Sequence, residues 1–253
     1  MNLNHKPTEE AYAELQQACD FFNQELFNGQ LPAFLITMQR QKNTMGYLSK
    51  SRFVHRNGTT IDELALNPAF FAVVPLIEIL QTIVHEQTHQ WQAYFGKPSR
   101  SGYHNTQWAN KMESVGLMPS STGQPGGHRT GQHMGDYTIP GGLFDLATQK
   151  LLSTGFAVSW FDRFPEPPPP KYAQDENGNV QLALMTMGIE AGPSTSMHVS
   201  RPGMFQLPQT ENKSNREKYT CPECRINAWG KPGLKLICAD CNKLLTSDVD
   251  EEM

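Results

Sequence analysis

Apolar positions recur at helical spacing near the start of the chain. Residues 8–28 are predicted to form an amphipathic helix, and Gly29 follows it as a stop signal. The residues that share its apolar face are Leu15, Ala18, Phe22 and Leu26. Cys19 lies on the same helix, and we interpret it as a small core residue.

Three short runs with β propensity follow this helix: 33–39, 46–55 and 60–68. These runs contain the aromatic and β-branched residues that favour strands. The positions that suggest a small sheet are Leu35, Thr37, Tyr47, Phe53, Ile61 and Leu64.

Residues 75–95 give the clearest helical pattern, with Pro75 suited to the first turn and Gly96 to the stop. Its apolar positions cover most of the circumference: Leu76, Leu80, Ile83, Val84, Trp91, Tyr94 and Phe95. The remaining positions form one polar stripe: Gln81, His85, Thr88, His89 and Gln92. We therefore expect a buried helix that keeps one narrow polar face for a purpose.

The pattern becomes less regular after this helix. Residues 105–115 predict a further helix with Asn105 as its cap, and residues 120–142 are rich in glycine and predict an ordered or semi-ordered loop. Residues 143–161 hold another amphipathic piece, which a proline run ends. Residues 166–218 are expected to be a linker with at most a short pair of strands.

The polar stripe contains the pattern H-E-x-x-H in the sequence HEQTH. Positions four apart share a helix face, so His85 and His89 can hold one metal ion, and Glu86 can act as a general base beside it. A catalytic zinc takes three protein ligands and leaves one position for water. His104 is our first choice for the third ligand and Glu113 the rival. His128 and His133 could line a substrate cleft or simply solvate a loop.

Four segments resemble the SprT-like, or Spartan-type, zinc metalloproteases: LFNGQLP, ELALNP, HEQTH and GYHNTQWANKM. The resemblance covers about residues 8–118. The long segment 120–215 departs from the short family members. The family's glycine-histidine-glycine run before the third ligand is also altered here, to Gly102-Tyr103-His104. The resemblance implies a zincin fold with zinc ligands His85, His89 and His104, and with Glu86 as catalytic acid/base. It also implies cleavage of proteins bound to DNA. We count Trp108, Tyr103, His128 and His133 as candidate cleft residues.

A second cluster of metal-ligand type lies near the C-terminus, where Cys221, Cys224, Cys238 and Cys241 form two C-x2-C pairs. Four thiolates complete a tetrahedral shell and leave no position for water, so this site predicts a structural zinc in a zinc ribbon. The segment is too short to bury a core without the metal.

Charge gives little support for a nucleic-acid partner, because the net charge of the 253-residue chain is −4. Residues 211–246 carry seven Lys or Arg and four Asp or Glu, but the four thiolates and the acidic tail offset that excess. An aromatic and basic patch in the ribbon could bind single-stranded DNA, or its residues could pack and solvate the ribbon; its members are Trp229, Lys231, Lys235 and Lys243. We expect a monomeric cytoplasmic protein with no membrane segment.

The predicted fold class is α+β, with a zincin-like core (1–120), a glycine-rich extension packed on it (121–164), a proline-rich linker (165–216), a four-cysteine zinc ribbon (217–246) and an acidic tail (247–253). The predicted function is that of a zinc-dependent endopeptidase with one catalytic and one structural zinc. Two alternatives are an inactive adaptor that binds nucleic acid or a partner, and a regulatory protease that is independent of DNA. Glu86 argues against the adaptor, because metal binding alone does not need this residue.

Overall fold

The computed structural model describes residues 6–165 and 216–247, which belong to two compact units. The predicted linker and acidic tail lie almost entirely outside the described residues, and so does most of the segment where a short strand pair was expected. The larger unit is α+β, as the sequence pattern predicts.

The sheet of the larger unit has three strands: β1 (Phe34–Met38), β2 (Gly46–Val54) and β3 (Thr60–Leu66). Their order is β1-β3-β2, with β1 parallel to β3 and β2 antiparallel to it. The central strand β3 is buried along most of its length. The three predicted strands are therefore confirmed, and β2 lies at an edge of this sheet.

Asn67 connects the sheet to the next helix. Its side-chain oxygen accepts a hydrogen bond from the Ala69 backbone at 3.1 Å, which caps the short 3-10 helix η1 (Pro68–Phe70). Its amide nitrogen donates to the backbone oxygens of Gln41 and Thr44, both at 2.9 Å. A buried asparagine thus has its hydrogen-bonding groups paired and fixes the loop between β1 and β2.

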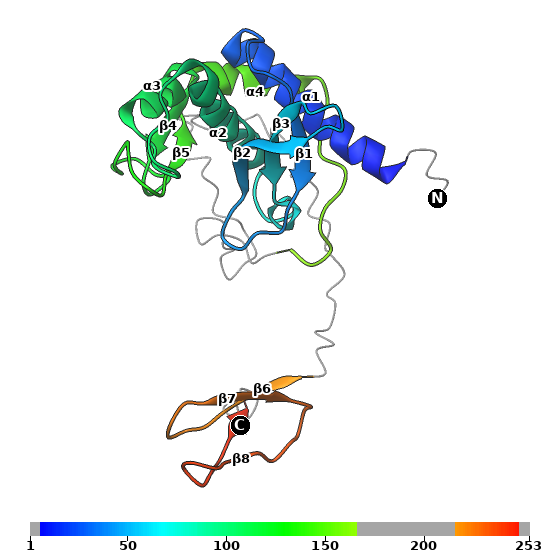
Figure 1. Ribbon diagram of the computed structural model, residues 1–253, viewed down its shortest axis with the longest axis vertical. Helices are drawn as coiled ribbons and strands as arrows, with labels where there is room; N and C mark the ends of the chain where they lie inside the picture. Colours follow the sequence, from blue (N-terminus) through cyan, green and yellow to red (C-terminus); the bar gives the residue numbers. More distant parts are fainter. Residues whose placement is uncertain (1–5, 166–215, 248–253) are drawn as a thin grey trace, which may run out of the picture. The chain divides into compact units, whose positions relative to one another are not determined.

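Four α-helices complete the larger unit: α1 (Pro7–Phe27), α2 (Leu76–Phe95), α3 (Thr106–Ser114) and α4 (Leu143–Ser153). In Figure 1, α2 runs between the sheet and the group formed by α3 and the strands β4 (Leu117–Ser120) and β5 (Gly135–Thr138). One hydrophobic cluster joins all four helices to the sheet. Cys19 is buried in this core, as its position on the first helix suggested. No helix within the described ranges has the length and apolar character needed to span a bilayer.

Close backbone packing between α2 and the sheet depends on Gly46. A Cβ atom at this position would lie 2.7 Å from Cγ2 of Thr82 and 2.9 Å from the backbone oxygen of Ala65. Glycine therefore lets the start of β2 approach α2 closely. This approach brings the sheet edge next to the histidine-bearing turns of the helix.

The glycine-rich extension is more ordered than the sequence predicts. Within the expected loop, β5 pairs antiparallel with β4, with Leu117 opposite Thr138. The amphipathic piece expected to run to residue 161 is helical only to Ser153, because Gly155 takes a left-handed conformation with φ of 81°. Helix α4 anchors the extension, since the ring of Phe144 stacks on Phe22 of α1 at 5.5 Å.

The smaller unit contains a sheet in the order β10-β6-β7 and a separate hairpin β8-β9. The strands are β6 (Glu217–Thr220), β7 (Asn227–Gly230), β8 (Ile237–Cys238), β9 (Lys243–Leu244) and β10 (Thr246–Ser247). Its small core consists of Tyr219, Cys221, Cys238 and Leu245. A core of four residues cannot offset the chain entropy lost on folding, so this unit needs another source of stability.

Truncation of Phe144 tests whether the extension is an integral part of the larger unit. Phe144→Ala should lower the free energy of unfolding by about 3–5 kcal/mol, because it leaves a cavity against Phe22. Leu146→Ala is the control, since Leu146 lies on the same helix but is 54% exposed. Urea unfolding of the full chain measures both, and equal midpoints for the two variants would contradict the packing described.

Candidate metal centre and active site

Helix α2 buries several polar side chains, and most have identified partners. Gln87 Nε2 donates to the backbone oxygen of Cys19 at 2.8 Å, and Thr88 Oγ1 donates to the backbone oxygen of Val84 at 2.9 Å. Gln90 Nε2 lies 3.2 Å from both the Pro32 backbone oxygen and a carboxylate oxygen of Asp62. The buried polar set is thus wider than the predicted stripe. Two residues expected on its apolar side, Tyr94 and Phe95, are instead exposed.

The structure brings three histidines together. His85 and His89 lie one turn apart on α2, and His104 lies just before α3. Each offers one ring nitrogen within 4.8 Å of the others, and Nε2 of His89 is 3.0 Å from Nε2 of His104. Tetrahedral zinc with Zn–N bonds of about 2.0–2.1 Å places ligand nitrogens about 3.4 Å apart, so the cluster has the dimensions of a zinc site.

A network of amides holds the loop that returns the chain to His104. The Asn105 side-chain oxygen accepts from Trp108 N at 3.1 Å, which caps α3, and from Gln92 Nε2 at 2.7 Å. The Asn105 amide donates to the Lys97 backbone oxygen at 3.1 Å, and the Lys97 N–H donates to Gln107 at 2.6 Å. The two ends of the loop are therefore tied to each other, and Gln92 ties its second end to the last turn of α2.

Hydrogen bonds at the Nδ1 atoms select the ring nitrogens that can bind a metal. Asp136 accepts a hydrogen bond from His85 Nδ1 at 2.9 Å, and the Gly131 backbone oxygen accepts one from His104 Nδ1 at 3.2 Å. Because a carboxylate and a carbonyl are acceptors, both Nδ1 atoms carry hydrogen, and Nε2 keeps its lone pair in the neutral ring. The donor set consequently fits a zinc ion held by three imidazoles.

The surroundings favour neutral rings at two of the three histidines. Burial lowers the pKa of His89, and the positive charges of His85 and His104 lower it further. Burial and the charge of His85 lower the pKa of His104 to about 4. Burial also disfavours the charged form of His85, but the hydrogen bond to Asp136 and the charge of Glu86 outweigh it and raise the pKa of His85. Neutral imidazole is the form that binds a metal.

Trp108 forms the floor of the histidine cluster rather than a wall of a cleft. Its ring centroid lies 4.4–5.2 Å from those of the three histidines, and its side chain is fully buried. The prediction that Trp108 lines a substrate cleft was therefore wrong, because no solvent-facing surface of the ring exists. Trp108 packs against the three imidazole rings and restricts their positions.

Glu86 is buried beside the cluster, with 6% of the residue exposed. Burial raises the pKa of its carboxyl, whereas the charge of His85 and the backbone of Leu48 in β2 lower it. A buried carboxylate next to a histidine cluster and a sheet edge is suited to accept and return a proton.

The other candidate residues lie around the cluster. The Glu113 carboxylate accepts from Arg129 Nε at 2.5 Å, so the structure pairs it with arginine and places His104 with the other histidines. His128 is exposed, and the described contacts of this residue involve its backbone. His133 is exposed near His104, where its charge adds a small lowering of that pKa to the larger effects of burial and His85. Tyr103 is half-buried, and the guanidinium carbon of Arg100 lies over its ring, 5.1 Å from the ring centroid.

The four cysteines of the smaller unit also form one cluster, with Sγ atoms within 4.8 Å of one another. Sγ of Cys224 is 3.6 Å from Sγ of Cys238, close to the separation of about 3.8 Å in a tetrahedral zinc thiolate site. The backbone N–H groups of Cys224 and Glu223 lower the pKa of Cys221 to about 7. A lowered pKa favours the thiolate, which is the form that binds a metal.

The two cysteine pairs adopt the same turn. The residue after each pair, Arg225 or Asn242, has a left-handed conformation with φ of 61° or 51°. Its N–H donates to the backbone oxygen of the first cysteine in the pair, at 3.0 Å and 2.8 Å respectively. This repeated turn points both sulfur atoms of each pair to a common centre, so the residues fit a structural zinc.

Asp136 is a site residue that no sequence motif identifies. It lies on β5, in the segment predicted to be a loop, and its side chain is 7% exposed. A single aspartate among glycines and turn residues has no spacing that relates it to HEQTH. The pairing of β5 with β4 and the packing against α2 place it next to His85, and neither was visible in the local pattern.

An α+β core with a three-histidine cluster on and next to a central helix is consistent with a metallopeptidase. The SprT-like family profile matches residues 15–126. An uncharacterized protein in mucB 3'region from Salmonella typhimurium is 58% identical over 59 residues, which are 23% of this chain and 80% of that protein. No solved structure matches the chain. The chain therefore belongs to the SprT-like family, and the resemblance seen in its motifs is confirmed.

Counting metal ions tests the two ligand assignments. The wild-type chain should hold two zinc ions, one per cluster, and His89→Ala should hold about one, because two imidazoles bind zinc weakly. Elemental analysis of purified protein measures the ratio. Glu113→Ala is the matched control and should keep both ions; loss of an ion in this variant, or retention of both in His89→Ala, would contradict the assignment.

Proposed function

We propose that the chain is a zinc-dependent endopeptidase. The observation that supports this most strongly is the three-histidine cluster with the buried Glu86 beside it, in a domain of the SprT-like family. Three nitrogen ligands leave one position of a tetrahedral zinc open, and this is the arrangement of catalytic rather than structural sites. The four-cysteine cluster has no such opening and is proposed to stabilise the smaller unit.

The chain's own residues provide the proton transfers of the reaction. A zinc ion at the histidine site would polarise the scissile carbonyl and make a water molecule more acidic. The Glu86 carboxylate takes a proton from the attacking water and passes it to the nitrogen of the leaving amine. Burial raises the pKa of the Glu86 carboxyl, so the carboxylate has a higher affinity for that proton. Trp108 and the hydrogen bonds at Nδ1 hold the imidazoles in place during these steps.

The edge strand β2 offers a place for an extended substrate chain. Within the described residues it pairs on one side, with β3, and the backbone of Leu48 lies near Glu86. An exposed strand edge presents N–H and C=O groups that can bind a peptide as an additional strand. A substrate bound along this edge would pass next to the proposed acid/base.

Proteins associated with DNA are the proposed substrate class, as the family resemblance implies. The smaller unit supplies a candidate surface for single-stranded DNA, where Trp229 lies opposite Lys218 in the β6-β7 pair. The Trp229 side chain is 64% exposed, so it does not pack in the core of the ribbon. An exposed ring beside a lysine can stack on a base while the ammonium group contacts a phosphate.

A protease assay with and without single-stranded DNA tests the proposed activity. Purified zinc-loaded protein should cleave a DNA-binding protein substrate when single-stranded DNA is added. Glu86→Gln should reduce the rate at least about 100-fold, since the amide cannot accept the proton. Zinc content of this variant is the control and should stay at the wild-type value.

Each outcome of that assay has a distinct meaning. Cleavage that does not change with DNA would keep the endopeptidase and remove DNA from the proposal. Absence of cleavage with both clusters occupied would contradict the peptidase for this substrate class and favour an adaptor that binds nucleic acid or a partner.

Substitution of Trp229 tests the DNA surface separately. Trp229→Ala should weaken binding of a labelled single-stranded oligonucleotide about 5- to 150-fold, because one base loses its stacking partner. Trp229→Phe should retain most of the affinity. Ile237→Ala removes a similarly exposed apolar side chain from the β8-β9 hairpin and should have no effect. Equal affinities for wild type and Trp229→Ala in a fluorescence anisotropy titration would contradict this surface.

A further inference from the structure

Asp136 links the glycine-rich extension to the histidine cluster. Its Oδ2 atom accepts the His85 Nδ1 hydrogen at 2.9 Å, and its Oδ1 atom accepts from Gln81 Nε2 at 3.0 Å. Both partners are donors, so each of the two carboxylate oxygens has a hydrogen-bond partner. Asp136 lies ten residues beyond the family match, which ends at residue 126.

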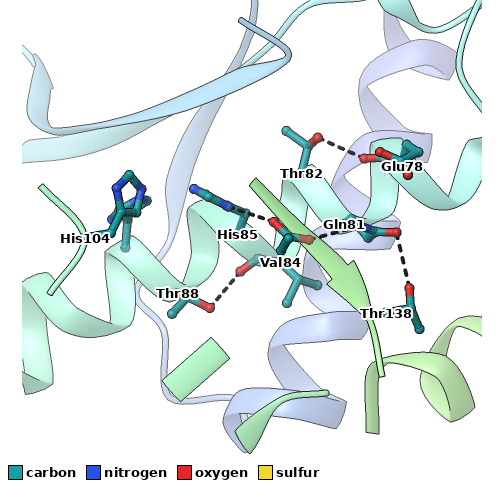
Figure 2. A network of polar contacts seen from close by, with 10 residues as sticks. Glu78, Gln81, Thr82, Val84, His85, Thr88, His104 and Thr138 are labelled. Carbon is teal, nitrogen blue, oxygen red and sulfur yellow. Dashed lines mark hydrogen bonds and ion pairs between the residues drawn. The ribbon is translucent and has the colours of Figure 1, made fainter. Parts of the chain in front are cut away.

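A second layer of contacts fixes the partner of Asp136. Thr138, on the same strand, donates from Oγ1 to Gln81 Oε1 at 3.2 Å, which orients the amide with its nitrogen toward Asp136. Figure 2 shows Gln81 and His85 one turn apart on α2, with Thr138 bonded to Gln81. The hydrogen-bond series Thr138–Gln81–Asp136–His85 therefore ends on the imidazole of a candidate metal ligand.

The same segment also holds a second histidine. Residues His104 and Gly131 exchange two backbone hydrogen bonds, at 2.8 Å and 3.1 Å, and the Gly131 oxygen accepts from His104 Nδ1. Thus two of the three imidazoles have their Nδ1 hydrogens bound by residues 131–136. These contacts set which nitrogen faces the metal and in which direction.

We propose that Asp136 is a positioning residue for the zinc site, so that the extension completes a metal centre that residues 15–126 do not complete alone. Its carboxylate holds His85 in the tautomer with hydrogen on Nδ1 and makes Nε2 a stronger donor to a cation. A buried carboxylate also adds negative charge near the bound ion. This inference rests on the proposed zinc site but does not depend on the substrate or on proteolysis.

The competing explanation is that Asp136 merely fastens β5 to α2. Such a role would change the stability of the fold and leave zinc affinity unaltered. The comparison must therefore measure zinc binding and folding stability in the same variants.

The experiment measures the zinc dissociation constant of the full chain by competition with a chromophoric chelator. The chain is expected to bind two zinc ions with separate dissociation constants, and the binding class that is missing in His89→Ala is that of the histidine site. Asp136→Ala should weaken this class about 10- to 100-fold, in line with loss of an outer-shell partner of a metal ligand. Asp136→Asn should lose less zinc affinity than Asp136→Ala, because Asn Oδ1 can still accept the His85 hydrogen. The Gln81 amide can rotate so that its oxygen accepts from the new NH₂ group.

Asp162→Asn is the matched control. This carboxylate is also buried, with 6% of its side chain exposed, and it pairs with Arg40 away from the histidines. Asp162→Asn should change the unfolding midpoint and leave the zinc dissociation constant within about two-fold of wild type. Cobalt(II) bound at the histidine site provides a second readout, since its visible absorption should change in Asp136→Ala and stay unchanged in Asp162→Asn.

A zinc dissociation constant of Asp136→Asn and Asp136→Ala equal to that of wild type, together with a reduced unfolding midpoint, would overturn the proposal. It would assign Asp136 to fastening alone. Because the readout is zinc binding, a negative protease assay leaves this result interpretable, and a positive protease assay does not substitute for it.

Discussion

Helix α2 must bury polar side chains in a hydrophobic core, and the rest of the larger unit is arranged around that constraint. A buried amide, hydroxyl or imidazole without a partner costs more free energy than a hydrogen bond typically returns. Partners therefore come from every direction: α1 offers the Cys19 carbonyl, β3 offers Asp62, and the helix itself offers the Val84 carbonyl. Two of the three imidazoles receive theirs at Nδ1, from Asp136 and from Gly131. A metal ion would use the Nε2 lone pairs, and the Nε2 atoms of His89 and His104 lie 3.0 Å apart.

This constraint explains why the extension belongs to the same unit as the HEQTH helix. Helix α4 buries Phe144 against α1, and β5 continues the short sheet begun by β4. These two attachments hold residues 131–138 against α2, where Asp136 and Thr138 contact Gln81 and His85. The loop between α2 and α3 is held in the same manner by Asn105 and Gln107. Rigid placement of the outer partners is what keeps a metal site in its working geometry.

The two clusters differ in the way that their proposed roles require. The histidine cluster borders a large hydrophobic core that joins four helices to a sheet, and it lies next to a sheet edge and a buried glutamate. The cysteine cluster is itself a large part of the small core around Tyr219. Metal binding would therefore add a reactive centre to the first unit and supply folding free energy to the second. Loss of zinc should therefore abolish the activity of the larger unit and unfold the smaller unit.

The local sequence determined the elements and the ligand types. Helical spacing located α1 and α2, runs with β propensity located β1, β2 and β3, and HEQTH and the two C-x2-C pairs identified candidate metal ligands. These features follow from short-range periodicity and from the preferences of side chains for metals. What spacing could not supply was contact between distant segments. The choice between His104 and Glu113, the burial of Trp108 and the place of Asp136 were all decided by tertiary packing. A turn-rich segment such as 120–142 has no period of its own, so its strand forms because β4 and α2 provide the partners that its backbone and its aspartate need.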